Sequence, residues 1–259
     1  MYFFDWPVFI KYLWPPTALQ NPLIRAGLIA TIVVSIIAQA VGVLLGLMAA
    51  LGKMSKFAPF RWLANAYIWY FRGTPLLVQM MLLFYGLGVT HIFNFPAIHI
   101  GALVISGAVQ AGTVALAVNE GAYMAEIVRA GIEAVDTGQM EAAKSLGMTY
   151  AQSMWRIVLP QAAKVIVPPL CNEFNNMMKT TSIMMVISAS ELFFAYTQIN
   201  AVVYKPFELF IAVSFYYLAM TTVWSLLQSW IESRLGERKT TTERMPGLLQ
   251  RVFAYKGGH

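Results

Sequence analysis

Five long apolar stretches, separated by short polar segments, constrain this chain more than any other feature of its sequence. They cover residues 24–51, 74–89, 101–124, 165–189 and 206–230. The core of a lipid bilayer requires about 20 apolar residues for each helix that crosses it. Only 12% of the 259 residues are charged, whereas soluble domains carry about 25%. We therefore expect an all-α polytopic membrane protein with five transmembrane helices.

The Lys and Arg residues are distributed unequally between the two sides of these predicted helices. Fourteen of the 18 fall on the side that carries residues 125–164 and the C-terminus. Three, Lys11, Arg25 and Lys205, fall on the other side, and Lys179 lies within a span. Because cytoplasmic loops are enriched in Lys and Arg, we place the N-terminus outside and the C-terminus in the cytoplasm. Topology thus explains the formal net charge of +6, and no nucleic-acid partner is expected.

The chain divides into three regions. Residues 1–23 hold seven aromatic side chains, and we expect them to lie at the membrane–water interface, where aromatic residues are enriched. Residues 24–230 form the transmembrane domain. Residues 231–259 form a basic cytoplasmic tail, which is either solvated or bound to lipid headgroups or a partner protein. The single cysteine, Cys171, and the three ungrouped histidines predict no metal site.

The long polar segment 138–162 has the sequence of a helical hairpin. Residues 141–146 are good helix formers, and Gly147 suits the left-handed position that ends a helix. Thr149 can cap a second helix, which we expect Pro160 to stop. An ordered polar hairpin between two spans suggests a docking surface for a partner on the cytoplasmic side.

This hairpin resembles the EAA signature of permease subunits of bacterial ABC importers. The pattern contains Glu-Ala-Ala, a nearby Gly, nine further residues and then Ile-x-Leu-Pro. The matching residues are Glu141, Ala142, Ala143, Gly147, Ile157, Leu159 and Pro160. The resemblance implies that they form a coupling helix, which sits in a groove of a separate ATPase subunit.

Three further stretches resemble the polar-amino-acid (histidine/glutamine-type) permeases within that group. They are FRGTPLLVQ at 71–79, AYMAEIVRAGIEAVDTGQMEAA at 122–143 and NEFNNMMKTTSI at 172–183. One departure is Thr180, where the group usually has Asp, so the carboxylate beside Lys179 is missing here. The resemblance covers roughly residues 24–230, nearly the whole folded part of the chain.

The family resemblance implies an assembly in the bacterial inner membrane. Two permease subunits, either this chain twice or this chain with a sister chain, would join a dimer of ABC ATPase subunits. An extracytoplasmic amino-acid-binding protein would deliver the amino acid substrate. ATP binding would bring the hairpins together and open the path outward, and hydrolysis would reset it.

A polar stripe marks one face of the fourth predicted span. At 100° per residue, five polar residues share this face: Asn172, Asn175, Asn176, Lys179 and Ser182. Ionisable groups inside a membrane usually face a cavity or one another, so the stripe could wall the translocation path or the interface between two permeases. The alternative is a polar contact between helices without any substrate contact.

Asn119 and Glu120 share a face of the third predicted span. An unpaired carboxylate at the depth of Glu120 is costly, so it needs a cation. One alternative is the ammonium group of the passing amino acid, and the other is an internal pair with Lys179. Gln79, in the second span, is a further candidate for lining the path.

Other residues of the family stretches are expected to be structural. Glu126 and Arg129 lie near the cytoplasmic end of the third span, where we expect them to pair with the hairpin. The second span is expected to open with Arg72, Gly73, Thr74 and Pro75. Pro75 suits a helix start, and Arg72 either holds the cytoplasmic interface or is a snorkelling anchor.

Motifs for nucleotide binding and catalysis are absent from the sequence. There is no G-x-x-x-x-G-K-[ST] segment and no suggestive pair of nucleophile and base. We expect a non-catalytic subunit without a cofactor of its own, the ATP and Mg being held by the ATPase. Two other classes stay open: an ion-driven secondary carrier, which would have discontinuous spans in matching halves, and a non-transporting membrane scaffold.

Overall fold

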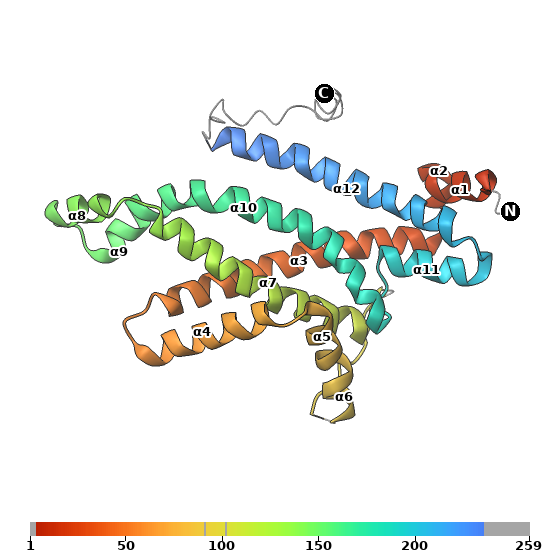
Figure 1. The fold of residues 1–259 in the computed structure, drawn as a ribbon, viewed down its shortest axis with the longest axis horizontal. Coiled ribbons are helices and arrows are strands. Elements are labelled where there is room, and N and C mark those ends of the chain that lie inside the picture. The colour runs from red at the N-terminus through yellow and green to blue at the C-terminus, as the bar shows by residue number, and fades with distance from the viewer. Residues whose placement is uncertain (1–3, 91, 102, 236–259) are drawn as a thin grey trace, which may run out of the picture.

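The computed structural model describes residues 4–90, 92–101 and 103–235. They form an elongated array of helices with one small β-hairpin (Figure 1). The predicted all-α class is confirmed, since the described strands are only β1 (Ile98–Ile100) and β2 (Leu103–Ile105). Most of the predicted basic tail, residues 236–259, and residues 1–3 lie outside the described residues.

Two of the described helices are long and apolar enough to cross a membrane, α3 (Pro22–Lys53) and α12 (Pro206–Arg234). A third candidate arises if Tyr150–Ile187 and Leu192–Val203, which bend by 48° at their break, count as one span. Length and composition alone therefore account for two or three of the five predicted spans.

The core of the molecule is the packing of α3 against α7 (Gly107–Glu133). A Cβ on Gly46 of α3 would lie 2.3 Å from the Cβ of Met124, and one on Gly42 would lie 2.8 Å from Cγ of Glu120. Only glycine permits so close an approach of the two helices. The side chains of Glu120 and its neighbours are thereby fixed at the centre of the array.

The second predicted span differs from the structure. Residues 58–73, which precede the predicted second span, form α4 (Ala58–Gly73), and this helix returns alongside α3 (Figure 1). The chain is extended at Thr74 and Pro75, and helix resumes in α5 (Leu76–Met81). A π-helical turn, η1 (Leu82–Gly86), and the short α6 (Leu87–Val89) follow.

The third predicted span begins later than expected. Residues 101 and 103–106 belong to the β-hairpin and its exit, in which His99 pairs with Val104 and Gly101 takes a positive φ of 59°. Helix α7 starts only at Gly107, because Ser106 caps it by accepting a hydrogen bond from the backbone N–H of Val109. Its C-terminal end at Glu133 extends well beyond the predicted limit at residue 124.

The fourth predicted span continues through its prolines. Helix α10 (Leu159–Thr180) includes Pro168 and Pro169 and passes into the 3₁₀ helix η3 (Thr181–Ile187). The chain then breaks at Ser188, whose φ is +57°. A further helix that the sequence analysis missed, α11 (Leu192–Val203), starts at the buried Glu191, which accepts two backbone N–H bonds as its N-cap.

The N-terminal region forms two short helices, α1 (Trp6–Leu13) and α2 (Pro15–Ala18), that pack near α11 and α12. The phenol of Tyr196 donates to the backbone oxygen of Tyr12 at 2.6 Å. Asp5 pairs with Lys205 at 3.2 Å, and the N–H of Val8 together with this ammonium holds the pKa of Asp5 below its usual value. These helices lie at the opposite end of the array from α8 and α9 (Figure 1).

Candidate translocation chamber and coupling hairpin

A polar chamber of about 390 Å³ lies where α5, α7, α10 and η3 meet. Its lining residues are Leu76, Leu116, Asn119, Glu120, Tyr123, Glu173, Asn176, Met177, Thr180 and Ile183. The lining thus includes two carboxylates, two carboxamides and two hydroxyls, beside apolar side chains. The structure brings Asn119 and Glu120 of the third predicted span together with Asn176 of the polar stripe.

Glu120 is held from behind by a residue that the sequence analysis missed. Nε2 of Gln39 on α3 donates to Oε1 of Glu120 at 3.1 Å, and both side chains are only 6% exposed. Among the residues that the structure describes, no ion pair joins Glu120 to Lys179, whose side chain is exposed. Of the two cations considered for Glu120, the internal one is therefore not its partner.

Glu173 is the second carboxylate of the chamber, and the sequence analysis passed over it. It lies within the predicted fourth span, and an acidic residue inside a span is itself a signal of a functional position. The sequence analysis grouped the neighbouring asparagines with Lys179 on one face of the helix, and it left Glu173 out of that group. Thr180 also lines the chamber.

Gln79 is not among the residues that line this chamber, and its side chain makes hydrogen bonds at the break between α4 and α5. Its Nε2 donates to the backbone oxygens of Phe71 and Thr74, each at 3.0 Å, and to Oγ1 of Thr74 at 2.8 Å. Its Oε1 accepts a hydrogen bond from Asn119 at 3.0 Å. The amide therefore satisfies the polar groups at the break between α4 and α5, where the helix leaves its last carbonyls without partners.

The remaining members of the polar stripe do not reach the chamber. Asn172 and Lys179 are exposed, and Ser182 donates to the backbone oxygen of Lys179 at 2.7 Å. Asn175 donates to Oγ of Ser225 on α12 at 3.1 Å, which is a polar contact between helices. One member of the stripe thus makes a polar contact between helices, and Asn172 and Lys179 lie on an exposed face.

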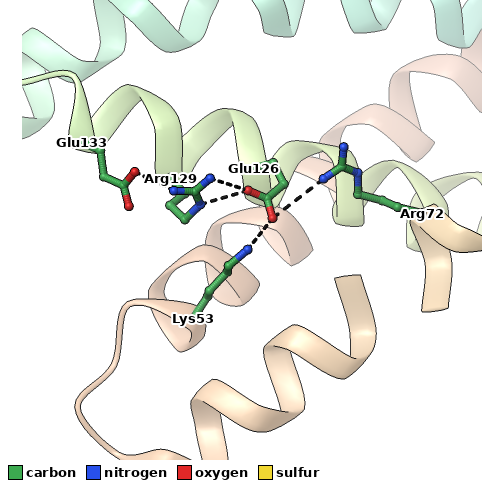
Figure 2. A network of polar contacts seen from close by, with 5 residues as sticks. All are labelled: Lys53, Arg72, Glu126, Arg129 and Glu133. Carbon is green, nitrogen blue, oxygen red and sulfur yellow. Dashed lines mark hydrogen bonds and ion pairs between the residues drawn. The ribbon is translucent and has the colours of Figure 1, made fainter. Parts of the chain in front are cut away.

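Glu126 is the centre of an ion-pair network near the end of α7 (Figure 2). Its carboxylate lies 2.5 Å from Nζ of Lys53, 2.8 Å from Arg129 and 3.8 Å from Arg72. Arg129 also pairs with Glu133 at 2.5 Å. The expectation that Glu126 and Arg129 pair with the hairpin is wrong, because their partners come from α3, α4 and α7 itself.

The four residues expected to open the second span are divided between two elements. Arg72 and Gly73 end α4, whereas Thr74 and Pro75 form the extended link before α5. The guanidinium of Arg72 also lies 5.4 Å from the ring centroid of Tyr123. Arg72 is therefore held by α7 and connects the break in the second span to the network around Glu126.

The predicted hairpin of residues 138–162 is formed by two helices, α8 (Thr137–Ser145) and α9 (Tyr150–Ser153). Gly147 takes the expected left-handed conformation, with φ of +77°. The N–H groups of Gly147 and Met148 bond back to the carbonyls of Lys144 and Ala143, which closes α8. Thr149 caps α9 as expected, in a reciprocal arrangement with Gln152.

Pro160 does not stop the hairpin's second helix as predicted. The chain stays helical through a π-helical turn, η2 (Met154–Val158), and enters α10 at Leu159. Pro160 lies in the first turn of α10, directly after this π-helical turn, and the helix continues through it. The hairpin is thereby joined rigidly to the helix that lines the chamber.

The EAA residues are divided between an exposed and a buried face of the hairpin. Glu141, Ala142 and Gly147 are exposed, whereas Ala143 is 1% exposed. Ile157 and Leu159 are half-buried beside a cluster that includes Val158 and Ala162. The arrangement leaves one face of the hairpin exposed and packs the opposite face against α7 and α10.

A family comparison decides the class of the chain. The family described as binding-protein-dependent transport system inner membrane component matches residues 42–237. The chain belongs to this family. It is therefore an integral membrane protein, and the similarity to ABC-importer permeases expected from the EAA residues is confirmed.

Individual relatives of this permease agree with the family match. The probable glutamine ABC transporter permease protein GlnM of Bacillus subtilis is 38% identical over 81% of this chain and 91% of that protein. The arginine transport system permease protein ArgU of Corynebacterium glutamicum is 35% identical over 93% of this chain and 76% of that protein. A crystal structure of an amino acid ABC transporter with histidines matches with a TM-score of 0.77 and 42% identity, covering 90% of this chain and 100% of the other.

Proposed function

We propose that this chain is the permease subunit of an ATP-driven importer of polar amino acids in the bacterial inner membrane. The observation that carries the proposal is the hairpin, in which Glu141, Ala142 and Gly147 lie exposed on a helix that is anchored to α7 and α10. A secondary carrier or a scaffold has no use for such a dock. The names of the related permeases, which include glutamine and arginine, support an amino acid as the substrate.

The proposed topology has five crossings with the N-terminus outside. They are α3, the broken series α4 to α6, α7, α10 with η3, and α12. The positions of α8 and α1 at opposite ends of the array support this arrangement (Figure 1). The N-terminal helices α1 and α2 then lie at the outer interface, and the basic tail lies in the cytoplasm.

The chain itself would not be catalytic. A dimer of ABC ATPase subunits would bind the ATP and Mg, and each hairpin would sit on one ATPase. Because η2 joins the hairpin to α10 without a loop, movement of the ATPase would be transmitted directly to a wall of the chamber. A second permease, identical or a sister chain, would cover the open face with Asn172 and Lys179, and an extracytoplasmic binding protein would deliver the substrate.

The chamber would be the place where the amino acid passes through this subunit. Glu120 and Glu173 supply negative charge for the ammonium group of the substrate, and Asn119, Asn176 and Thr180 supply polar contacts. Among the described residues, neither carboxylate has an ion-pair partner, so both are available to a cationic group. This site favours cationic and neutral polar amino acids over acidic ones.

Co-purification with the ATPase tests the proposal. Glu141→Arg combined with Gly147→Asp should abolish recovery of the ATPase with the permease, because the exposed face of the hairpin would carry the wrong charge and shape. The matched control is Lys164→Glu with Gln161→Asp, which alters exposed positions of α10 outside α8 and α9. Unchanged recovery of the ATPase with the hairpin variant, folded normally, would contradict the proposed dock.

A further inference from the structure

A second hollow, separate from the polar chamber, lies between the C-terminal half of α3 and the N-terminal half of α4. Its volume is about 640 Å³, which is within the range of about 300–1,000 Å³ for small-molecule sites. Its lining residues are Leu45, Met48, Ala49, Leu51, Gly52, Ser55, Phe60, Leu63, Ala64 and Tyr67. The hydroxyl of Tyr67 is engaged elsewhere, because it donates to the backbone oxygen of Val118 at 2.6 Å. The groove is therefore apolar along most of its length.

Two cations without a protein counter-ion lie at one end of this groove. Lys56 and Arg61 are exposed, and within the described ranges neither takes part in an ion pair. Nη1 of Arg61 donates to the backbone oxygen of Ser55 at 3.3 Å, which holds the guanidinium beside a lining residue. Lys53, in contrast, is used by Glu126. An anionic group at the mouth of the groove would satisfy Lys56 and Arg61.

Exposed aromatic residues surround the same end. Phe57, Phe60 and Trp62 are 58%, 60% and 73% exposed, and the rings of Phe57 and Phe60 meet edge to face at 5.1 Å. Aromatic side chains gather at the level of lipid headgroups, at the boundary between the bilayer and water. The apolar part of the groove then lies in the hydrocarbon region, and its basic end lies at the headgroups.

We propose that this groove binds an anionic phospholipid, with an acyl chain along α3 and α4 and the phosphate at Lys56 and Arg61. The groove matches a lipid in both parts, since it is apolar where the chain would lie and basic where the headgroup would lie. Basic pockets between transmembrane helices on the cytoplasmic side are known to take anionic headgroups. The inference uses the membrane insertion of the chain and the cytoplasmic placement of the loop, but it does not depend on which substrate is transported.

Native mass spectrometry of the full-length permease, purified with its ATPase, tests this site. The complex is titrated with phosphatidylglycerol or with phosphatidylethanolamine of the same acyl chains. The wild type should retain phosphatidylglycerol preferentially. Lys56→Gln with Arg61→Gln should lower that preference by roughly fivefold or more, since each basic side chain at an anionic surface contributes about 1 kcal/mol, or fivefold. Met48→Trp, which fills the groove, should weaken binding of both lipids.

The matched control removes two exposed cations elsewhere on the same side, Arg156→Gln with Lys164→Gln. It should leave the preference unchanged. Equal losses in both double variants would mean that the lipid senses net charge alone and would overturn the site. An unchanged preference in Lys56→Gln with Arg61→Gln would also overturn the site. A change in the number of permease copies in the Met48→Trp variant would overturn it as well, because the groove would then hold a second copy of the permease. Lipid binding is measured here without any measurement of transport or of membrane orientation. A negative result would therefore leave the importer proposal unaffected.

Discussion

At the residue scale, Glu120 has a carboxylate that is held in position but has no ion-pair partner among the described residues. Gln39 holds one carboxylate oxygen, Gly42 leaves room for the side chain, and Glu120 lines the chamber. A carboxylate so held can recognise a cation without first being reoriented. A substitution that keeps the size of the side chain can therefore test substrate recognition by Glu120 separately from its contribution to folding.

Glu120→Gln keeps the size of the side chain and removes the charge that would attract a substrate ammonium. Uptake of cationic and neutral amino acids, all of which carry the ammonium group, should fall about 10- to 100-fold, because a hydrogen bond to a charged group contributes about 1.5–3 kcal/mol. Uptake of acidic amino acids should fall less, because the substitution also removes their repulsion by the carboxylate. Uptake in proteoliposomes with the binding protein and ATPase measures this. Glu133→Gln, at a carboxylate outside the chamber, should leave the ranking unchanged. A normal ranking together with poor folding of Glu120→Gln would indicate a structural role instead.

Glu126 has the opposite character, because its charge is already balanced by three cations from three helices (Figure 2). Glu126→Gln should lower the free energy of unfolding by about 1–3 kcal/mol, since it weakens charged hydrogen bonds in a half-buried network. Thermal unfolding of the purified permease in detergent measures the change. Glu133→Gln, which removes one exposed pair with Arg129, should cost about 0.5 kcal/mol. Equal losses in the two variants would show that the network adds nothing beyond single surface pairs.

At the scale of elements, the contact between α3 and α7 depends on the absence of side chains at a few positions. A Cβ on Gly46 would meet Met124 and the backbone of Ala125, whereas a Cβ on Gly73 would meet nothing within 4 Å. Gly46→Ala should therefore cost about 1–3 kcal/mol through overpacking, and Gly73→Ala should be neutral within about 0.5 kcal/mol. Unfolding measurements on both variants compare the two glycines directly. Similar midpoints would mean that α3 and α7 separate at little cost.

Sequence patterns predicted elements well where they depend on neighbouring residues. The turn at Gly147 and the cap at Thr149 follow from local chemistry, and both are present in the structure. Breaks in the helices are set by tertiary contacts and were missed. The return of α4 along α3 depends on Gln79 and Asn119 satisfying the polar groups at its end, and α11 depends on the buried Glu191. No short window of sequence contains both Asn119 and Phe71. The cap of Glu191 on Phe193 and Phe194 is local, in contrast, and the sequence analysis overlooked it.

The candidate site follows the same rule. Asn119 and Glu120 were expected on the path because an ionisable group inside a span demands a reason. Their neighbours Gln39 and Glu173 come from other helices, and periodicity within a single helix cannot reveal them. The hairpin was predicted to hold the partners of Glu126 because it lies close in the sequence, but the partners that lie close in space come from α3, α4 and α7.

At the scale of the whole molecule, the coupling hairpin and α11 lie at opposite ends of the array (Figure 1). Five crossings with the N-terminus outside place Leu146 in the cytoplasm and Val202 outside. Both side chains are highly exposed, at 81% and 80%, so a cysteine at either position would react freely with a maleimide. Cys171 is 3% exposed, and its replacement by Ser provides a background without reactive thiols.

A membrane-impermeant maleimide should therefore label Val202→Cys in intact spheroplasts and Leu146→Cys only after permeabilisation. Labelling before and after permeabilisation, read by gel shift, measures the side on which each residue lies. Adding the ATPase should then protect Leu146→Cys in permeabilised membranes, because the hairpin would be covered. The reverse pattern would invert the proposed orientation. Labelling of both positions from the same side would require an even number of crossings between them, and α10 with η3 could then not be a complete span.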